Sequence, residues 1–214
     1  MNEFYKILTT YNKTHHNHLL QQNGWMKIYN SMTPPIYWSK LGEILSDYPR
    51  NFFCYEIGSG GGDVLSLLLF LNFIDVQGIE KNLSLCLAIN QKIDFLFKRK
   101  NIVQCGVYPI KINRTPDILI QVNCLYPNDS RNKEEFIEQL KAWHIFNGVP
   151  KVYILEVIDN DFHEEHQAYP YFVRLSDKDI NHNFSEFHIT SYETYKFPNH
   201  SSSKKIYVIK TPDK

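Results

Sequence analysis

The stretch CYEIGSGGGD, residues 54–63, constrains the fold of this chain more than any other segment. Four of its ten residues are glycine, whereas the whole chain of 214 residues contains nine. The stretch overlaps a short apolar run, Phe52–Ile57, and precedes a longer one, Val64–Phe73. Glycine permits tight turns with positive φ and lets a ligand approach the backbone closely. We therefore interpret the stretch as a shaped turn between a buried strand and a buried helix.

The rest of the chain continues this alternation of strands and helices. Further strands are predicted at 76–80, 101–105, 117–123 and 151–157, and helices at 64–73, 82–100 and 133–147. Alternation of this kind favours a parallel sheet with right-handed crossovers. The last two apolar runs, 187–197 and 204–210, have a turn between them and predict an antiparallel hairpin. The predicted fold is therefore α/β and doubly wound, with a mostly parallel seven-stranded sheet and a C-terminal antiparallel hairpin.

The residues before the first strand predict an N-terminal helical extension. Apolar spacing in 2–13 and 38–45 indicates two helices, separated by the polar stretch THHNHLLQQNGW. We expect the extension to span 1–48 and to pack on a single domain of residues 49–214. The histidines of HHNH, residues 15–18, are expected to be solvated, and a lid over a substrate is the alternative.

Composition and charge exclude several classes of function. Lys and Arg together number 23, and so do Asp and Glu, so the basic excess of a non-specific nucleic-acid binder is missing. The longest apolar run, 64–74, is broken by Ser66 and Asn72 and is shorter than the roughly 18 residues that span a membrane. The first residues lack a basic-then-apolar signal pattern, and the cysteines lack metal or disulfide spacing. We expect a cytoplasmic protein with no membrane segment, no metal site and mostly buried cysteines.

The register of the glycines indicates which ligand the turn accepts. A dinucleotide turn follows GxGxxG, but Asp63 stands where its last glycine would be. The stretch fits ExGxGxG better, with Glu56 ahead of Gly58, Gly60 and Gly62. An acid at that place repels a pyrophosphate and attracts an amino group. A ligand with an ammonium group, a carboxylate and a ribose therefore suits the turn, and S-adenosylmethionine is such a ligand.

YEIGSGGG resembles motif I of the class I S-adenosylmethionine-dependent methyltransferases, and the resemblance runs from about Phe52 to the C-terminus. In that family a second strand ends in an acid that binds the ribose, a fourth strand ends in Asp or Asn beside the methyl donor, and a hairpin closes the sheet. The sequence departs from the pattern at Cys105, where members often carry an Asp for the adenine. The resemblance implies a cofactor site made of Glu56, Gly58, Ser59, Gly60, Gly62, Glu80, Lys81, Cys105, Gly106 and Asn123.

The candidates for the chemistry follow the fourth and fifth strands. Methyl transfer from a sulfonium needs proximity and alignment, and a base only when the acceptor must lose a proton. Asn123 and Tyr126 lie in NCLYP, which is similar to the Asn-Pro-Pro-Tyr motif of amino-methylating members but lacks its first proline. Tyr126 is either a substrate wall or a packing residue. His163 is either a base, being titratable near neutrality, or a surface residue.

The sequence thus predicts an S-adenosylmethionine-dependent methyltransferase that acts on a small molecule or a peptide. A non-catalytic protein of the same fold, which binds the nucleoside or a partner without turnover, is the main alternative. A nicotinamide-dependent oxidoreductase is a third reading, against which Asp63 and the terminal hairpin both argue. The acceptor and the oligomeric state stay open.

Overall fold

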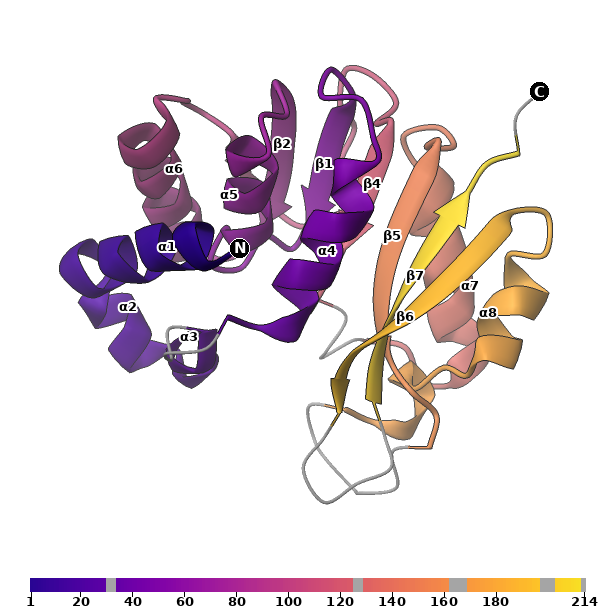
Figure 1. Cartoon of the computed structure of the whole chain (residues 1–214). Coiled ribbons are helices and arrows are strands. Elements are labelled where there is room, and N and C mark those ends of the chain that lie inside the picture. Colours follow the sequence, from indigo (N-terminus) through magenta and orange to yellow (C-terminus); the bar gives the residue numbers. More distant parts are fainter. Residues whose placement is uncertain (30–33, 125–128, 162–168, 197–202, 213–214) are drawn as a thin grey trace. The chain divides into compact units, whose positions relative to one another are not determined.

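The structure is a computed structural model that describes residues 1–29, 34–124, 129–161, 169–196 and 203–212. It forms two compact units, one of residues 1–52 and 59–106 and the other of residues 53–58 and 107–214 (Figure 1). The helices are α1 (Asn2–His15), α2 (Asn17–Gln22), α3 (Gly24–Tyr29), α4 (Ile36–Ser46), α5 (Asp63–Phe70), α6 (Leu83–Phe97), α7 (Lys133–Ile145) and α8 (Asp177–Asn183), with a 3₁₀ turn η1 (Tyr171–Val173). The strands are β1 (Phe53–Ile57), β2 (Asp75–Glu80), β3 (Val103–Cys105), β4 (Ile118–Gln121), β5 (Val152–Ile158), β6 (His188–Lys196) and β7 (Ser203–Lys210).

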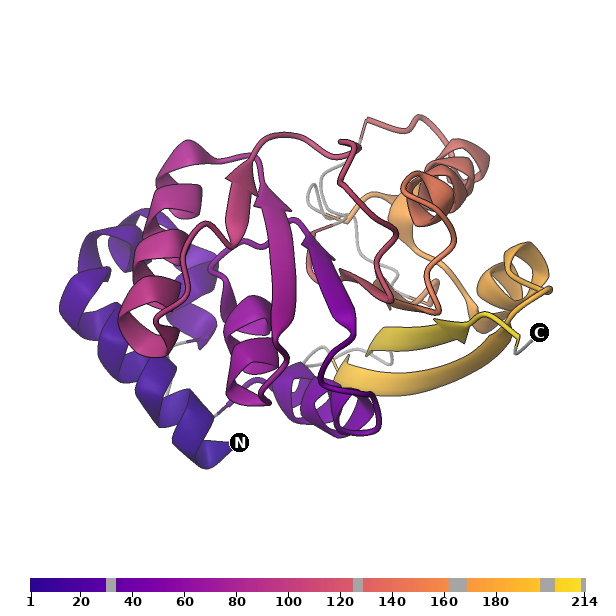
Figure 2. The same cartoon turned by 90° about the horizontal axis from the view of Figure 1, so that it is seen from above.

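The strands form a seven-stranded sheet in the order β3-β2-β1-β4-β5-β7-β6. β2 pairs with β3, β1 with β4, and β4 with β5, all in parallel. β7 runs antiparallel to both β5 and β6. Figure 2 shows β6 and β7 side by side. This arrangement confirms the predicted α/β class, the mostly parallel seven-stranded sheet and the C-terminal antiparallel hairpin.

In the first unit the N-terminal helices pack on α5 and α6. Phe4 of α1 lies 5.4 Å from Trp38 of α4 and 5.2 Å from Phe70 of α5, measured between ring centroids. Further along α1, Tyr11 lies 5.2 Å from Phe95 of α6. The predicted extension is therefore helical and contributes to the same core as α5 and α6. The predicted boundary between residues 48 and 49 stays a prediction.

The polar stretch that follows α1 differs from the expectation of a solvated segment. Residues 17–22 form α2, which directs Leu19 and Leu20 into a buried cluster with Met26 and with α6. His16 is buried, although it belongs to the polar run HHNH. Its ring lies 5.0 Å from the ring of Tyr11. Burial, and then the nearby Lys92 ammonium, lowers the pKa of His16 to about 4. The neutral imidazole packs as an aromatic side chain, which the polarity of its neighbours in the sequence conceals.

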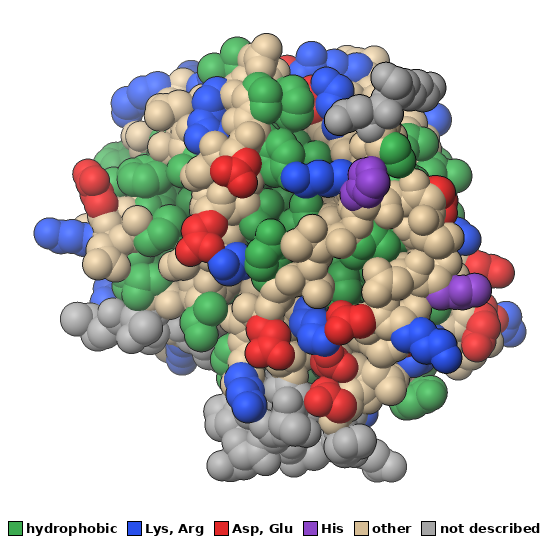
Figure 3. All heavy atoms as spheres, turned by 45° about the vertical axis from the view of Figure 1, so that its right-hand side comes forward, with side chains coloured by type: hydrophobic (Ala, Val, Ile, Leu, Met, Phe, Trp, Pro, Cys, Tyr) green, Lys and Arg blue, Asp and Glu red, His purple; other side chains and the backbone are tan. Residues whose placement is uncertain are grey.

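In the second unit β4 and β5 form a buried sheet core. All seven residues of β5 and all four of β4 are buried, as is typical of parallel strands covered on both faces. α8 begins with a capping box in which Ser176 and Asp179 satisfy each other's backbone N–H groups. Asp179 also pairs with Lys133 of α7 at 3.2 Å, so the two helices are linked. On the face drawn in Figure 3, acidic and basic side chains lie interspersed with apolar ones.

Candidate functional site

The second part of the glycine stretch, from Ser59 onward, forms a hydrogen-bonded turn that leads into α5. The Ser59 N–H donates to Ile79 O of β2 at 3.0 Å, and the Gly62 N–H donates to Ser59 O at 2.6 Å. Gly60 and Gly62 have positive φ of 52° and 73°. Gly62 is the N-cap of α5 and offers no side chain to the free N–H groups of the first turn. As far as the described residues show, those N–H groups and the positive end of the helix dipole can face a ligand.

Close packing of α6 explains why position 62 carries glycine. A Cβ at Gly62 would lie 2.5 Å from Cγ2 of Ile89, well inside van der Waals contact, and the φ of 73° is strained for any other residue. The turn therefore has a single shape, set by its own glycine and by the helix behind it. Asp63, where a dinucleotide turn would continue with glycine, is already the first residue of α5.

Glu80 ends β2 and binds the glycine turn through its carboxylate. Its Oε2 accepts the Gly60 N–H at 2.8 Å, and its Oε1 accepts the Asn82 N–H at 2.9 Å. Asn82 in turn caps α6 through the Leu85 N–H, as its sequence position predicts. Glu80 is buried, yet each carboxylate oxygen can accept more than one hydrogen bond. The predicted ribose-binding acid thus lies against the predicted cofactor turn.

A buried lysine on α6, which the sequence interpretation missed, holds the same turn. Lys92 is 1% exposed, donates to the Gly61 carbonyl and lies 3.1 Å from the Asp63 carboxylate. A buried ammonium is costly unless it is paired and hydrogen-bonded, and here it is both. The sequence does carry a signal, because Lys92 falls on the same helical face as Ala88, Ile89 and Ile93.

The residues predicted beside the adenine lie at the end of β3. The Gly106 N–H donates to Glu80 O at 3.0 Å, so the backbone after β3 is tied to the end of β2. Cys105 is exposed, contrary to the expectation of buried cysteines. Cys86 of α6 is buried, and its thiol lies 2.9 Å from Glu80 O. Burial, and then Cys105, raises the pKa of Cys86 to about 12. Lys81 is exposed directly after Glu80.

In the second unit, β1 ends at the first glycine of the stretch. Glu56 is buried in β1 and pairs in register with Ile120 of β4. Gly58 follows with φ of 70°, and a Cβ there would lie 2.4 Å from Cβ of Cys124. Because Cys124 comes directly after Asn123, the close approach at Gly58 brings the end of β1 against the segment that follows β4.

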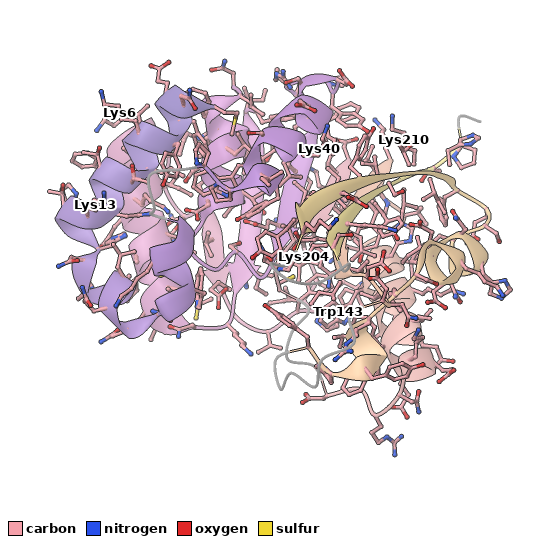
Figure 4. All side chains as sticks on the ribbon, turned by 60° about the horizontal axis from the view of Figure 1, so that its bottom comes forward. Lys6, Lys13, Lys40, Trp143, Lys204 and Lys210 are labelled. Carbon is pink, nitrogen blue, oxygen red and sulfur yellow. The ribbon has the colours of Figure 1, made fainter. Side chains whose placement is uncertain are left out.

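Asn123 lies just after β4 in a left-handed conformation, with φ of 56°. Its N–H donates to Oε2 of Glu156 at 3.0 Å, and its Oδ1 accepts a hydrogen bond from Nζ of Lys204. Lys204 lies near the beginning of β7 (Figure 4). Glu156 is 1% exposed. Burial raises its pKa, although Lys204 and the hydrogen bonds from Asn123 and Thr194 oppose that effect.

Two predicted catalytic residues, Tyr126 and His163, lie outside the described residues. Their roles stay predictions. Glu156 and Lys204 were not identified from the sequence as residues near Asn123. Glu156 did carry a signal, because an acid inside the apolar run KVYILEV is unusual for a buried strand.

Comparison with known proteins places this geometry in a known fold. No family model matches the chain, and no curated protein matches it. Among solved structures, it is similar to an S-adenosylmethionine-dependent methyltransferase from Clostridium acetobutylicum, with a TM-score of 0.62 and 14% identity over 90% of this chain and 99% of that one. It is also similar to a magnesium protoporphyrin IX methyltransferase from Synechocystis with bound SAH, with a TM-score of 0.64 and 15% identity over 96% and 99% of the two chains. The methyltransferase domain of a bacterial Hen1 gives 0.61 and 13% over 84% and 98%.

These likenesses confirm the fold that the resemblance implies. The chain has the fold of the class I methyltransferases, with few identical residues. Sequence identities of 13–15% establish the fold, but not the activity, the substrate or the site residues.

Proposed function

We propose that the protein binds S-adenosylmethionine and transfers its methyl group to a small molecule or a peptide. The observation that carries the proposal is the bond from the Gly60 N–H to the Glu80 carboxylate at 2.8 Å. It joins an acid at the end of β2 to a positive-φ glycine turn ahead of α5. The Glu80 carboxylate can bind a ribose, and the glycine turn and the N-terminus of α5 can bind an amino acid.

Each part of the proposed site has a defined task. Glu80 accepts the ribose hydroxyls on lone pairs that Gly60 and Asn82 leave available, and Lys81, Cys105 and Gly106 border the nucleoside. Glu56, Gly58, Ser59 and Gly62 shape the amino-acid end. Bound S-adenosylmethionine supplies a methyl group that its sulfonium charge has already activated. Asn123 borders the place of transfer and orients the acceptor.

The acceptor is proposed from charge and size. The chain has equal numbers of acidic and basic residues, which disfavours a polyanionic nucleic acid. Magnesium protoporphyrin IX, named for one similar structure, belongs to that protein. None of the helices in the described ranges has the length and apolar character needed to cross a bilayer. We propose a cytoplasmic protein whose acceptor diffuses to it.

Calorimetry with S-adenosylmethionine and S-adenosylhomocysteine tests the cofactor. The wild-type protein should bind both, and Glu80→Ala should weaken binding by about 1–3 kcal/mol, because a charged hydrogen-bond acceptor is lost. Glu3→Ala removes an exposed acid on α1 and is the matched control, for which we expect unchanged affinity. Folded wild-type protein that binds neither compound would refute the proposal.

A non-catalytic binding protein is the alternative, because Cys105 replaces the common adenine acid and NCLYP lacks a proline after Asn123. Incubation with S-adenosylmethionine labelled on its methyl group, against panels of small molecules and peptides, separates the two. Label transfer to any acceptor supports the enzyme, and binding without transfer across the panel supports the alternative. A large thermal shift with NAD, and none with S-adenosylmethionine, would favour an oxidoreductase instead.

A further inference from the structure

We propose that Lys204 and Glu156 are positioning residues, which hold Asn123 in place at the reacting end of the methyltransferase site. The proposal rests on the proposed function, since it gives Asn123 its role. Neither residue belongs to the glycine turn or to the segments that the sequence identifies as cofactor-binding.

The two residues hold Asn123 by different groups. Glu156 accepts its backbone N–H at 3.0 Å, and Lys204 donates to its side-chain Oδ1. One bond fixes the main chain and the other fixes the carboxamide. A non-glycine residue with φ of 56° is uncommon and persists where its surroundings hold it. Asn123 is therefore fixed in both position and rotamer.

The two residues also depend on each other. Glu156 is 1% exposed, and an isolated carboxylate at such a place is costly. Nζ of Lys204 lies 3.8 Å from its Oε2, and the Thr194 hydroxyl donates to its Oε1 at 3.4 Å. A charge pair in the interior is weak support for stability, because desolvation offsets most of its attraction. By holding Asn123 in place, the pair of Glu156 and Lys204 has a role that its small contribution to stability does not explain.

Neighbouring groups restrict where the lysine can reach. Its Nζ lies 5.9 Å from the ring centroid of Tyr169, whose carbonyl accepts two hydrogen bonds from Arg174 at 3.0 and 2.7 Å. Lys204 extends from β7, where it pairs in register with Ile158 of β5. The ammonium is thus held between an aromatic face, the Glu156 carboxylate and Asn123.

A purely structural ion pair between β5 and β7 is the competing explanation. It predicts that loss of Lys204 lowers stability but leaves the reacting end unchanged. The adjacent Lys205 provides a matched control, because it is also half-buried near the start of β7 and pairs with Asp159 at 2.7 Å and Asp177 at 3.0 Å. Successive strand residues point to opposite faces, so Lys205 carries the same charge away from Asn123.

A double-mutant cycle measured by calorimetry decides between the positioning role and a purely structural ion pair. We would measure the affinities for S-adenosylmethionine and S-adenosylhomocysteine on four proteins. These are the wild type, Asn123→Ala, Lys204→Met and the double variant. The ratio of the two affinities reports on the methyl group together with the sulfonium charge, which only S-adenosylmethionine carries. We expect each single change to alter the ratio by about three- to tenfold, the size of one ordinary hydrogen bond. Lys204→Met should then add nothing in the Asn123→Ala background, since coupled residues are non-additive.

Two further variants keep the result interpretable. Glu156→Gln combined with Lys204→Met leaves no unpaired buried charge, so we expect it to fold even if Lys204→Met alone unfolds. It should show the same altered ratio. Lys205→Met should lower the melting temperature and leave the ratio unchanged. An unchanged ratio for Lys204→Met, or changes that simply add to those of Asn123→Ala, would overturn the role. Wild-type protein that binds neither compound would overturn the proposed function and this role with it.

Discussion

Gly62 shows how a single residue defines the turn before α5. Its φ of 73° and the 2.5 Å approach of Ile89 leave room for hydrogen alone. Gly62→Ala should lower the free energy of unfolding by at least about 1–2 kcal/mol, because both the backbone and α6 must shift. Gly24→Ala is the matched control: nothing lies within 4 Å of a Cβ there, so stability should stay constant or rise by about 0.5 kcal/mol. Denaturant titration of both variants measures the difference, and equal stability would contradict this account.

His144 makes the stability of the second unit depend on pH. Its ring is stacked on Tyr153 at 4.9 Å and lies 5.0 Å from Phe187. Burial lowers its pKa to about 4, against a weaker opposite effect of Glu186. Between pH 6.5, the ordinary pKa of histidine, and about pH 4, this histidine is protonated in the unfolded chain and neutral in the folded one. The stability of the fold therefore falls as the pH falls through this range.

We expect this histidine to contribute about 2 kcal/mol to the loss of stability between about pH 7 and pH 5. Denaturant titrations across this range should show a shallower decline for His144→Phe than for the wild type. His182→Gln, on the exposed side of α8, is the control and should keep the wild-type decline. Parallel curves for His144→Phe and the wild type would show that His144 is not the group that responds.

At the level of elements, α6 acts as a support for the turn before α5. Lys92 donates to Gly61 O and pairs with Asp63 at 3.1 Å. Lys92→Met removes one partner of a buried pair and should cost about 3–5 kcal/mol of stability. Combination with Asp63→Asn should recover part of this loss. Lys100→Met, exposed just beyond α6, should have little effect on chemical denaturation, and a similar loss there would contradict the assignment.

The same elements show what a sequence can and cannot predict. β1 and β5 are mostly apolar runs between turn residues, so their position follows from the pattern alone. α2 was missed because HHNHLLQQ contains two apolar residues, too few to show a helical period. Its burial depends on Leu85 and Ala88 of α6, more than sixty residues further along the chain. Contacts of that range leave no local signature.

At the scale of the whole molecule, the order of the elements predicted the topology and most of the proposed cofactor site. Glu80 and Asn123 were proposed because each stands at the end of a predicted strand, at a place where the family that the sequence resembles carries a site residue. Lys204 could not be found in this way, because alternation in KKIYVIK assigns it a face of a strand but no partner. Structures of the same fold share 13–15% identity with this chain, so the pattern of elements persists where individual residues do not.

The bond between Lys204 and Asn123 also predicts the order in which parts of the chain fold during synthesis. Gly60 and Glu80 are 20 residues apart, whereas Asn123 and Lys204 are separated by 81. Domains fold while they are synthesised, and contacts distant in sequence form last. We expect a nascent chain to acquire its glycine turn early and its ordered Asn123 only after β7 has left the exit tunnel. Stalled chains that stop before or after β7 should share protease protection of α6, so a protein cut short there would retain the glycine turn without an ordered Asn123.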